Sequence, residues 1–183
     1  MERVICLLIG YVFGLFQTAY FYGKTKGIDI RKYGSGNAGT TNALRVLGTK
    51  AGLIVFAGDC LKCIIAVCIT RALFSTGHPE NIYLLCLYTG AGAIIGHNFP
   101  FYMGFKGGKG IAATAGLILS FHPYFIVMGV VLFFGAFLTT HYVSLGSLLV
   151  YAGFMIQMVV CGQMGLFGAM PQSQLYEIGR AHV

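Results

Sequence analysis

Long apolar segments separated by short polar ones make up most of the chain. Six apolar segments have lengths that suit helices in a membrane: 4–22, 51–74, 82–96, 111–121, 124–138 and 142–161. The third and fourth are short for a full bilayer and flank a polar loop, which we expect to dip into the protein and line a cavity. The pattern predicts an all-α polytopic membrane protein with six spans. They form a single transmembrane domain over residues 1–170, followed by an irregular tail at 171–183.

The composition supports this interpretation. The chain is 57% hydrophobic and 9% charged, with a mean hydropathy of +0.78, and a water-soluble protein of this size would carry more charge. The six cysteines lie in apolar runs, so we expect no disulfide framework. Cys60 and Cys63 form a C-x-x-C without further metal ligands, so the sequence predicts neither a metal site nor a cofactor.

Basic residues indicate how the spans are oriented. Half of the twelve lysines and arginines lie in or beside the first connection: Lys24, Lys26, Arg31, Lys32, Arg45 and Lys50. The second connection has none, and the third has Lys106 and Lys109. Because short basic loops stay in the cytoplasm, the first, third and fifth connections are expected inside and the N-terminus outside. The basic pI near 9.2 then reflects topology and contact with anionic membrane lipid, and no nucleic-acid partner is expected.

The first connection contains a polar, glycine-rich segment from Ser35 to Arg45. Its G-x-G-x-x-G pattern is no dinucleotide fingerprint, because no strand precedes it. It offers exposed backbone N–H groups, hydroxyl and amide donors, and one arginine, which together suit a phosphate. The candidate ligands are Ser35, Gly36, Asn37, Gly39, Thr41, Asn42 and Arg45. The alternative is a polar turn at the membrane edge with charges that only set the topology.

The third connection contains a second such segment. Gly107 and Gly108 allow close approach of an oxyanion, and Lys109 adds charge just before a new helix. The pattern is one residue short of a P-loop and lacks its Ser/Thr, so it indicates no magnesium-nucleotide site. Lys106 has an alternative interpretation without a binding role, as a lysine that snorkels from the membrane edge into water. His97 could hydrogen-bond a substrate, handle a proton or be structural.

Two further features involve polar residues near or within spans. Asp59 and Lys62 are one helical turn apart inside the second span, where an internal ion pair is the favoured interpretation. Ser144 and Ser147 follow the fifth connection and form a third polar cluster. All three polar clusters are therefore predicted to open on one face of the membrane, which is the argument for a site.

These segments resemble a known family. Ser35-Gly36-Asn37-x-Gly39-x-Thr41-Asn42-x-x-Arg45, then Gly96-His97-x-x-Pro100 with Phe105-x-Gly107-Gly108-Lys109-Gly110, and Tyr142-Val143-Ser144-Leu145-x-Ser147 are similar to the three signatures of bacterial acyl-phosphate:glycerol-3-phosphate acyltransferases of the PlsY type. The resemblance implies a seven-helix, multi-pass enzyme of the bacterial inner membrane with its site on the cytoplasmic face. It would move a fatty acyl group from acyl phosphate to glycerol 3-phosphate, giving lysophosphatidic acid and phosphate in phospholipid biosynthesis. A soluble enzyme that forms acyl phosphate would be a further partner, besides membrane lipid.

The resemblance also assigns roles. Ser35, His97, Lys109 and Ser144 would be catalytic. The phosphates would be bound by Gly36, Asn37, Gly39, Thr41, Asn42, Arg45, Gly107, Gly108, Lys109 and Ser147. We expect direct attack by the glycerol hydroxyl on the acyl carbon without an acyl-enzyme. Either His97 or a substrate phosphate would accept the proton.

The C-terminus departs from the family pattern. The family's last span and its His-x-x-Asn-type motif have no match in 162–183, and the final six residues resemble translated sequencing adapter. A truncated or chimeric C-terminus would make the chain an inactive fragment. A transporter or channel for an anionic metabolite is the other alternative, because phosphate ligands and half-length spans suit it too.

Overall fold

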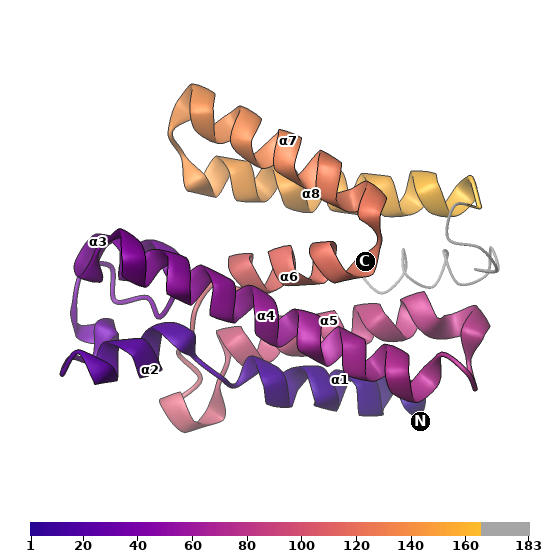
Figure 1. The fold of residues 1–183 in the computed structure, drawn as a ribbon, viewed down its shortest axis with the longest axis horizontal. Helices are drawn as coiled ribbons and strands as arrows, with labels where there is room; N and C mark the ends of the chain where they lie inside the picture. Colours follow the sequence, from indigo (N-terminus) through magenta and orange to yellow (C-terminus); the bar gives the residue numbers. More distant parts are fainter. Residues whose placement is uncertain (166–183) are drawn as a thin grey trace.

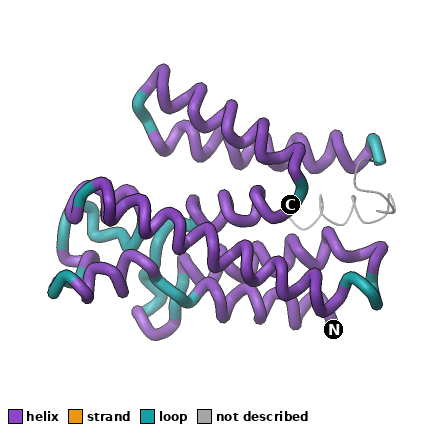
Figure 2. The backbone as a smooth tube through the Cα atoms, viewed as in Figure 1, coloured by secondary structure: helices purple, strands orange, loops and turns teal. Residues whose placement is uncertain are grey.

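The computed structural model describes residues 1–165, and in that part of the chain the regular structure is helical throughout (Figure 2). The α-helices are α1 (Glu2–Gly14), α2 (Thr18–Thr25), α3 (Thr40–Leu47), α4 (Thr49–Phe74), α5 (Ile82–Asn98), α6 (Ile111–Phe121), α7 (Pro123–Thr140) and α8 (Val143–Gln163). Short 3-10 turns are η1 (Ile30–Lys32), η2 (Pro79–Asn81) and η3 (Phe101–Met103). The predicted end of the domain at residue 170 and the tail at 171–183 lie outside the described residues.

The all-α fold class is confirmed, and the six predicted apolar segments are helical except at residues 15–17 and at Tyr142. Five stretches are long and apolar enough to cross a membrane: Glu2–Thr25, Thr49–Phe74, Pro79–Met103, Pro123–Thr140 and Val143–Gln163. The sixth, α6, has 11 residues. At 1.5 Å per residue it spans about half of a bilayer's hydrocarbon core. The third segment, also predicted to be short for a full bilayer, is part of the 25-residue stretch Pro79–Met103 and is long enough to cross.

The long helices form a layered bundle with an outlying hairpin (Figure 1). Helices α1, α4, α5 and α6 make the body, and α7 and α8 pair with each other and join the body through α6. The largest core cluster lies where the hairpin meets the body, around Phe121 and Phe125, with Met158 and Cys161 of α8. Toward the α7–α8 turn the hairpin is largely exposed, with apolar side chains such as Leu138 and Leu148 on its surface. Such surfaces suit contact with lipid.

The closest helix packing is between α1 and α5, and glycines make it possible. A Cβ atom on Gly10 or Gly14 would overlap the backbone of α5, and one on Gly92 or Gly96 would overlap that of α1. Each helix therefore carries a small-xxx-small pair on the face toward the other. In lipid, where burial of apolar surface does not drive association, such close contact between backbones is a main source of helix pairing.

The first span is interrupted, which the sequence pattern did not predict. Its single apolar segment at 4–22 folds as two helices, because α1 ends at Gly14 and α2 starts at Thr18. Gln17 between them has an extended backbone and a fully buried side chain. Its Nε2 donates to the carbonyl oxygen of His97 at 2.9 Å and approaches that of Gly14 at 3.4 Å. Lys62 of α4 donates to the carbonyl of Phe16 at 2.7 Å, so polar side chains satisfy carbonyls that the break releases, as the interior of a membrane requires.

Candidate functional site

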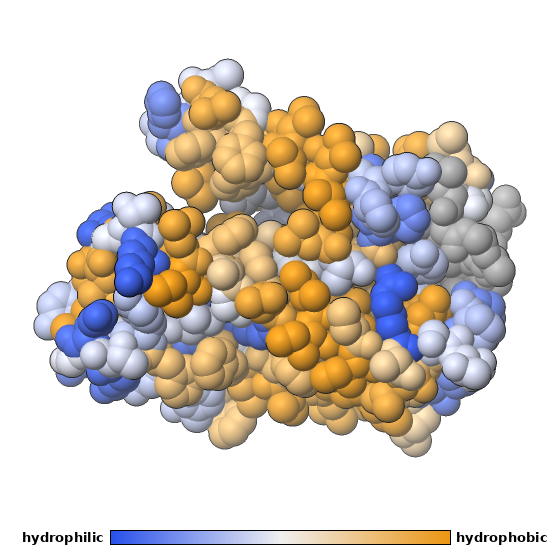
Figure 3. Space-filling model, in the orientation of Figure 1, coloured by the Kyte–Doolittle hydropathy of each residue, from blue (hydrophilic) through white to orange (hydrophobic). Residues whose placement is uncertain are grey.

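The three predicted polar clusters lie at one end of the bundle. The loop from α2 to α3, the segment from α5 to α6 and the α7–α8 turn all lie on the left of Figure 1, and the N-terminus and η2 lie at the opposite end. In Figure 3 hydrophilic residues lie toward the two ends, left and right, and the middle of the molecule is mostly hydrophobic. The convergence of the clusters on one side is thus present in the fold.

The first two clusters meet in an open cleft of about 490 Å³. One wall comes from the α2–α3 connection and the other from the α5–α6 connection. The lining residues are Asp29, Arg31, Lys32, Ser35, Gly36, Asn37, Lys106, Gly107 and Lys109. Of the predicted site residues, the cleft therefore brings together Ser35, Gly36, Asn37, Gly107 and Lys109 across 70 residues of sequence.

The first wall is held in shape by Asn42 of α3. Its side-chain oxygen accepts the backbone N–H of Ser35 at 2.9 Å, and its Nδ2 donates to the carbonyls of Ile30 and Tyr33 at 3.2 and 3.0 Å. Gly34 has a positive φ of 59°, and a Cβ there would be 2.3 Å from the Asn42 oxygen. Asn42 is buried and its amide is occupied by the loop, so the structure places it behind the wall and not in the cleft.

The second wall folds back on the end of α5. The N–H groups of Gly107 and Gly108 donate to the carbonyls of Asn98 and His97 at 3.0 and 3.1 Å. A Cβ on Gly108 would be 2.0 Å from His97 Nε2, so the loop lies directly against the imidazole. His97 is only 2% exposed and supports this wall from behind. Lys109 lies two residues before α6 begins, where the helix dipole also favours an anion.

The cleft carries an excess of positive charge. Arg31, Lys32, Lys106 and Lys109 line it together with one carboxylate, that of Asp29. Arg31 binds Asp29 through two hydrogen bonds, at 3.0 and 2.8 Å. This bonding lowers the pKa of Asp29 to about 2, so its carboxylate stays ionised at neutral pH. The other cations, Lys32, Lys106 and Lys109, make the cleft suited to a dianion such as a phosphate ester. The loop amides contribute less than the sequence predicts, because the N–H groups of Ser35, Gly36, Gly107 and Gly108 already donate within the protein.

The other predicted ligands do not line the cleft. Arg45 and Thr41 lie on α3 with exposed side chains and do not line the cleft. Gly39 is buried at the start of α3. The arginine that the first connection contributes is Arg31, with Lys32 beside it. Their positions four and three residues before Ser35 are a signal that could have found them, but charge counting assigned them to topology alone.

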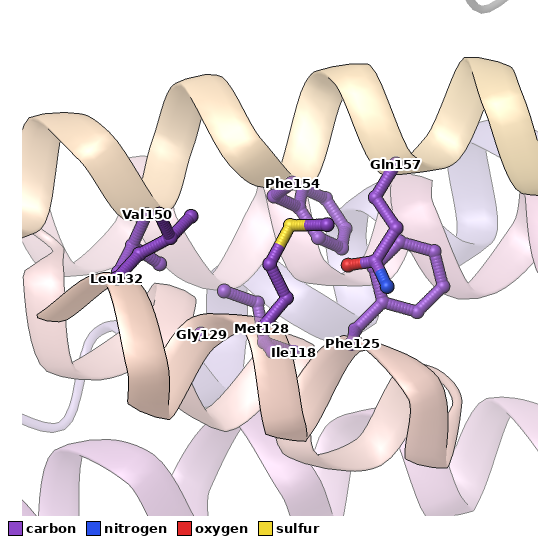
Figure 4. A pocket seen from close by; sticks show the side chains of 8 residues that line it. All are labelled: Ile118, Phe125, Met128, Gly129, Leu132, Val150, Phe154 and Gln157. Atoms are coloured by element: carbon purple, nitrogen blue, oxygen red, sulfur yellow. The ribbon is translucent and has the colours of Figure 1, made fainter.

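The third cluster lies at the same end of the bundle but does not line the cleft. Ser144 is exposed at the start of α8, and buried Ser147 donates its hydroxyl to the carbonyl of Val143 at 2.8 Å. Deeper in the hairpin, Met128 and Leu132 of α7 face Phe154 and Gln157 of α8 across an apolar seam (Figure 4). Gln157 donates to the carbonyl of Tyr124 at 3.0 Å, which closes one end of the seam.

The chain matches known proteins over most of its length. Residues 4–177 match the sequence profile of the family described as glycerol-3-phosphate acyltransferase. The glycerol-3-phosphate acyltransferase of Halalkalibacterium halodurans is 45% identical over 151 residues, which cover 81% of this chain and 71% of the relative. The enzyme of the same name from Staphylococcus saprophyticus is 42% identical over 152 residues, with 81% and 75% covered.

Two solved structures have the same fold. Both are of PlsY, described as an integral membrane glycerol 3-phosphate acyltransferase, one in a glycerol 3-phosphate form and one in a lysophosphatidic acid form. They superpose with TM-scores of 0.78 and 0.77 at 32% and 31% identity, covering 88% of this chain and 78% of theirs. With the apolar helices, the two-walled cationic cleft and these matches, the chain belongs to the glycerol-3-phosphate acyltransferase family of integral membrane proteins.

Proposed function

We propose that this protein transfers a fatty acyl group from acyl phosphate to glycerol 3-phosphate, producing lysophosphatidic acid and inorganic phosphate. The observation that carries the proposal is the cleft between two glycine-rich loops, lined by four cations and a single carboxylate. Both proposed substrates bring a phosphate group with a charge near −2 at neutral pH. Their mutual repulsion must be offset by positive groups before they can react, and this cleft supplies such groups.

The proposed reaction needs little covalent chemistry from the protein. Acyl phosphate is a mixed anhydride and is already activated. The glycerol hydroxyl oxygen attacks the acyl carbonyl carbon, a carbon–oxygen ester bond forms, and the bond from that carbon to the phosphate oxygen breaks. Phosphate leaves with the electron pair, and the hydroxyl proton passes to a phosphate oxygen. Positioning and charge stabilisation would supply most of the rate.

The proposed roles follow from the positions of the side chains. Lys109, beside the start of α6, would hold the departing phosphate, and Ser35 and Asn37 would hydrogen-bond the reacting groups from the opposite wall. Arg31 and Lys32 line the same wall as Ser35 and would bind glycerol 3-phosphate together with Lys106. We keep Arg45, Thr41, Ser144 and Ser147 as proposed contacts of bound substrate, because they lie at the same end of the bundle (Figure 1). Their part would be to meet the portions of the two substrates that project beyond the cleft.

The position of the cleft relative to the membrane spans is consistent with a lipid product. The cleft lies at one end of the spans, so a phosphate can be held there while the acyl chain remains among apolar helices. We place this end at the cytoplasmic face of a bacterial inner membrane, because the basic loops gather there. A soluble enzyme that makes acyl phosphate could then deliver the donor from the cytoplasm.

The proposal is tested by phosphate release. Purified protein in lipid nanodiscs is mixed with palmitoyl phosphate and glycerol 3-phosphate, and inorganic phosphate and lysophosphatidic acid are measured. Release that needs both substrates and matches the lysophosphatidic acid formed is the expected result. No acyl transfer, together with uptake of labelled glycerol 3-phosphate into proteoliposomes, would overturn the enzyme in favour of a transporter.

A further inference from the structure

A buried polar network lies behind the glycine loop, inside the membrane-spanning part of the bundle. It joins Thr18 of α2, Asp59 and Lys62 of α4, and His97 of α5. The residues Asp59, Lys62 and His97 are 1%, 5% and 2% exposed. Charged groups in this position are costly, so they are retained where the arrangement does something that apolar residues cannot do. The predicted internal ion pair between Asp59 and Lys62 is present, with the two atoms 2.9 Å apart.

The ammonium group of Lys62 has a full set of acceptors. Its Nζ lies 2.7 Å from the carbonyl oxygen of Phe16, 2.9 Å from Asp59 Oδ1 and 2.7 Å from His97 Nδ1. A lysine ammonium has three hydrogens to donate and no lone pair. The three short contacts match these three hydrogens, and the carbonyl oxygen of Gly14 lies farther away, at 3.4 Å. One of them satisfies a carbonyl that the break in the first span leaves without a helical partner.

This geometry decides the protonation of His97. Lys62 is paired with Asp59, and its ammonium group can only donate, so Nδ1 at 2.7 Å is the acceptor of the imidazole and the ring proton is on Nε2. An imidazolium would instead point an N–H at a positive charge. Asp59 Oδ1 is 3.7 Å from Nδ1, beyond hydrogen-bond distance, and accepts from Thr18 and Lys62. The Nε2 side of the ring faces Gly108, the residue next to the cleft wall.

We propose that Lys62, anchored by Asp59, is a positioning residue that fixes His97 as the neutral, Nε2-protonated tautomer and so holds the Gly107–Gly108 wall of the cleft. This inference rests on the proposed function only for its effect on catalysis. It makes the His97 ring a support for the loop, with Nε2–H on the side of Gly108, and it removes His97 from the candidates for proton acceptor. It also explains why the charge pair lies next to the end of α5.

The first test reads the tautomer directly and needs no substrate. Protein with ¹⁵N-labelled histidine is studied by NMR in nanodiscs near neutral pH, and the His97 signals are identified by their loss in His97→Gln. The expected result is a neutral ring with the proton on Nε2. A ring protonated on Nδ1, or on both nitrogens, would overturn the proposal whether or not the protein transfers acyl groups.

The second test removes the charge pair as a unit. In the double variant Asp59→Asn/Lys62→Met no charge is left unpaired, so the loss of folding that a single change would risk is reduced. We expect the His97 signals to show a mixture of tautomers, and kcat/KM for glycerol 3-phosphate to fall about 100-fold, because a wall displaced by about 1 Å costs that much. An unchanged tautomer and unchanged activity in a folded double variant would contradict the proposal.

A matched control separates positioning from general stability. Thr70 of α4 and Thr89 of α5 form another buried polar pair between the same two helices, with their hydroxyls 2.6 Å apart. The double variant Thr70→Val/Thr89→Val removes this pair farther from the cleft. It is expected to leave the His97 tautomer and the kcat/KM within about twofold of the parent. A loss as large as that of the charge-pair variant would assign the effect to helix packing and overturn the positioning role.

Discussion

Gly108 is the position where the smallest change should have a large effect. The carbon that a Gly108→Ala substitution adds would lie 2.0 Å from His97 Nε2. The imidazole cannot turn away without losing the contact of its Nδ1 with Lys62, so the loop has to move instead. We expect kcat/KM to fall about 100-fold in the phosphate-release assay while the protein stays folded. Gly77→Ala is the control, because nothing lies within 4 Å of its added carbon, and it should behave as the parent.

Substitution of Asn42 tests the other wall of the cleft. The change Asn42→Asp keeps the oxygen that accepts from Ser35 but removes the donor to Ile30 and Tyr33. Two carbonyls lose their partner and a buried charge is added, so we expect a loss of about 1–3 kcal/mol of stability and a raised KM for glycerol 3-phosphate. Thermal unfolding in detergent and steady-state kinetics measure the two effects. An unchanged Tm would show that the loop does not depend on these bonds.

Residue types and spacing were enough to predict that the two glycine-rich loops meet at one site, but not which side chains turn toward the cleft. Ser35 and Lys109 line it, whereas Asn42 and His97 belong to the same motifs and lie behind the walls. A motif records both kinds of residue without distinguishing them. The contact between Lys62 and His97 joins two helices, and no local pattern in the sequence reports a partner 35 residues away.

At the scale of helices, the α1–α5 contact makes a clear stability prediction. A Cβ on Gly92 would lie 2.1 Å from the carbonyl oxygen of Leu7, so Gly92→Ala must push the two backbones apart. We expect the free energy of unfolding to fall by about 1–3 kcal/mol, measured by thermal or denaturant unfolding in detergent. Gly135→Ala on α7 has open space around it and should be neutral or slightly stabilising. Equal effects in the two variants would argue against close packing as the cause.

The lengths of the apolar segments and the polar residues between them predicted the long helices well. The segment 111–121 has the same bounds as α6, and the segment 82–96 ends two residues before α5 does. The break in the first span was not predicted, because hydropathy does not fall at Leu15 and Phe16. What ends α1 there is tertiary: Gln17 and Lys62 supply the hydrogen bonds that make an interrupted helix tolerable within the bundle.

At the scale of the whole molecule, the positive cleft predicts how activity responds to charge. Lys109→Ala removes a cation from the wall beside the start of α6 and should lower kcat at least about 100-fold, because one charge of the bound phosphates is then unmatched. Lys106→Ala, on the same wall but farther from the start of α6, should mainly raise KM for glycerol 3-phosphate. Steady-state kinetics with each substrate varied in turn distinguishes the two. Nearly normal kcat in Lys109→Ala would exclude its assignment to the departing phosphate.

Ionic strength gives an independent measurement on the unaltered protein. Salt screens exposed charges over roughly 8–10 Å at physiological concentrations, and the cleft is open to solvent. We expect KM for glycerol 3-phosphate to rise with added sodium chloride, and inorganic phosphate to inhibit competitively at lower concentration than chloride. A KM that does not depend on salt would indicate that the cleft cations do not attract the substrate.

The cysteines of the described helices have a practical consequence for establishing the orientation of the protein. All six are free; five are buried, and Cys68 lies on α4 inside a membrane-spanning stretch. A membrane-impermeant maleimide should therefore find little to label in the parent protein. A single cysteine introduced at Lys26 or at Gly77 would then report directly which compartment each end of the bundle faces, without first replacing the native thiols.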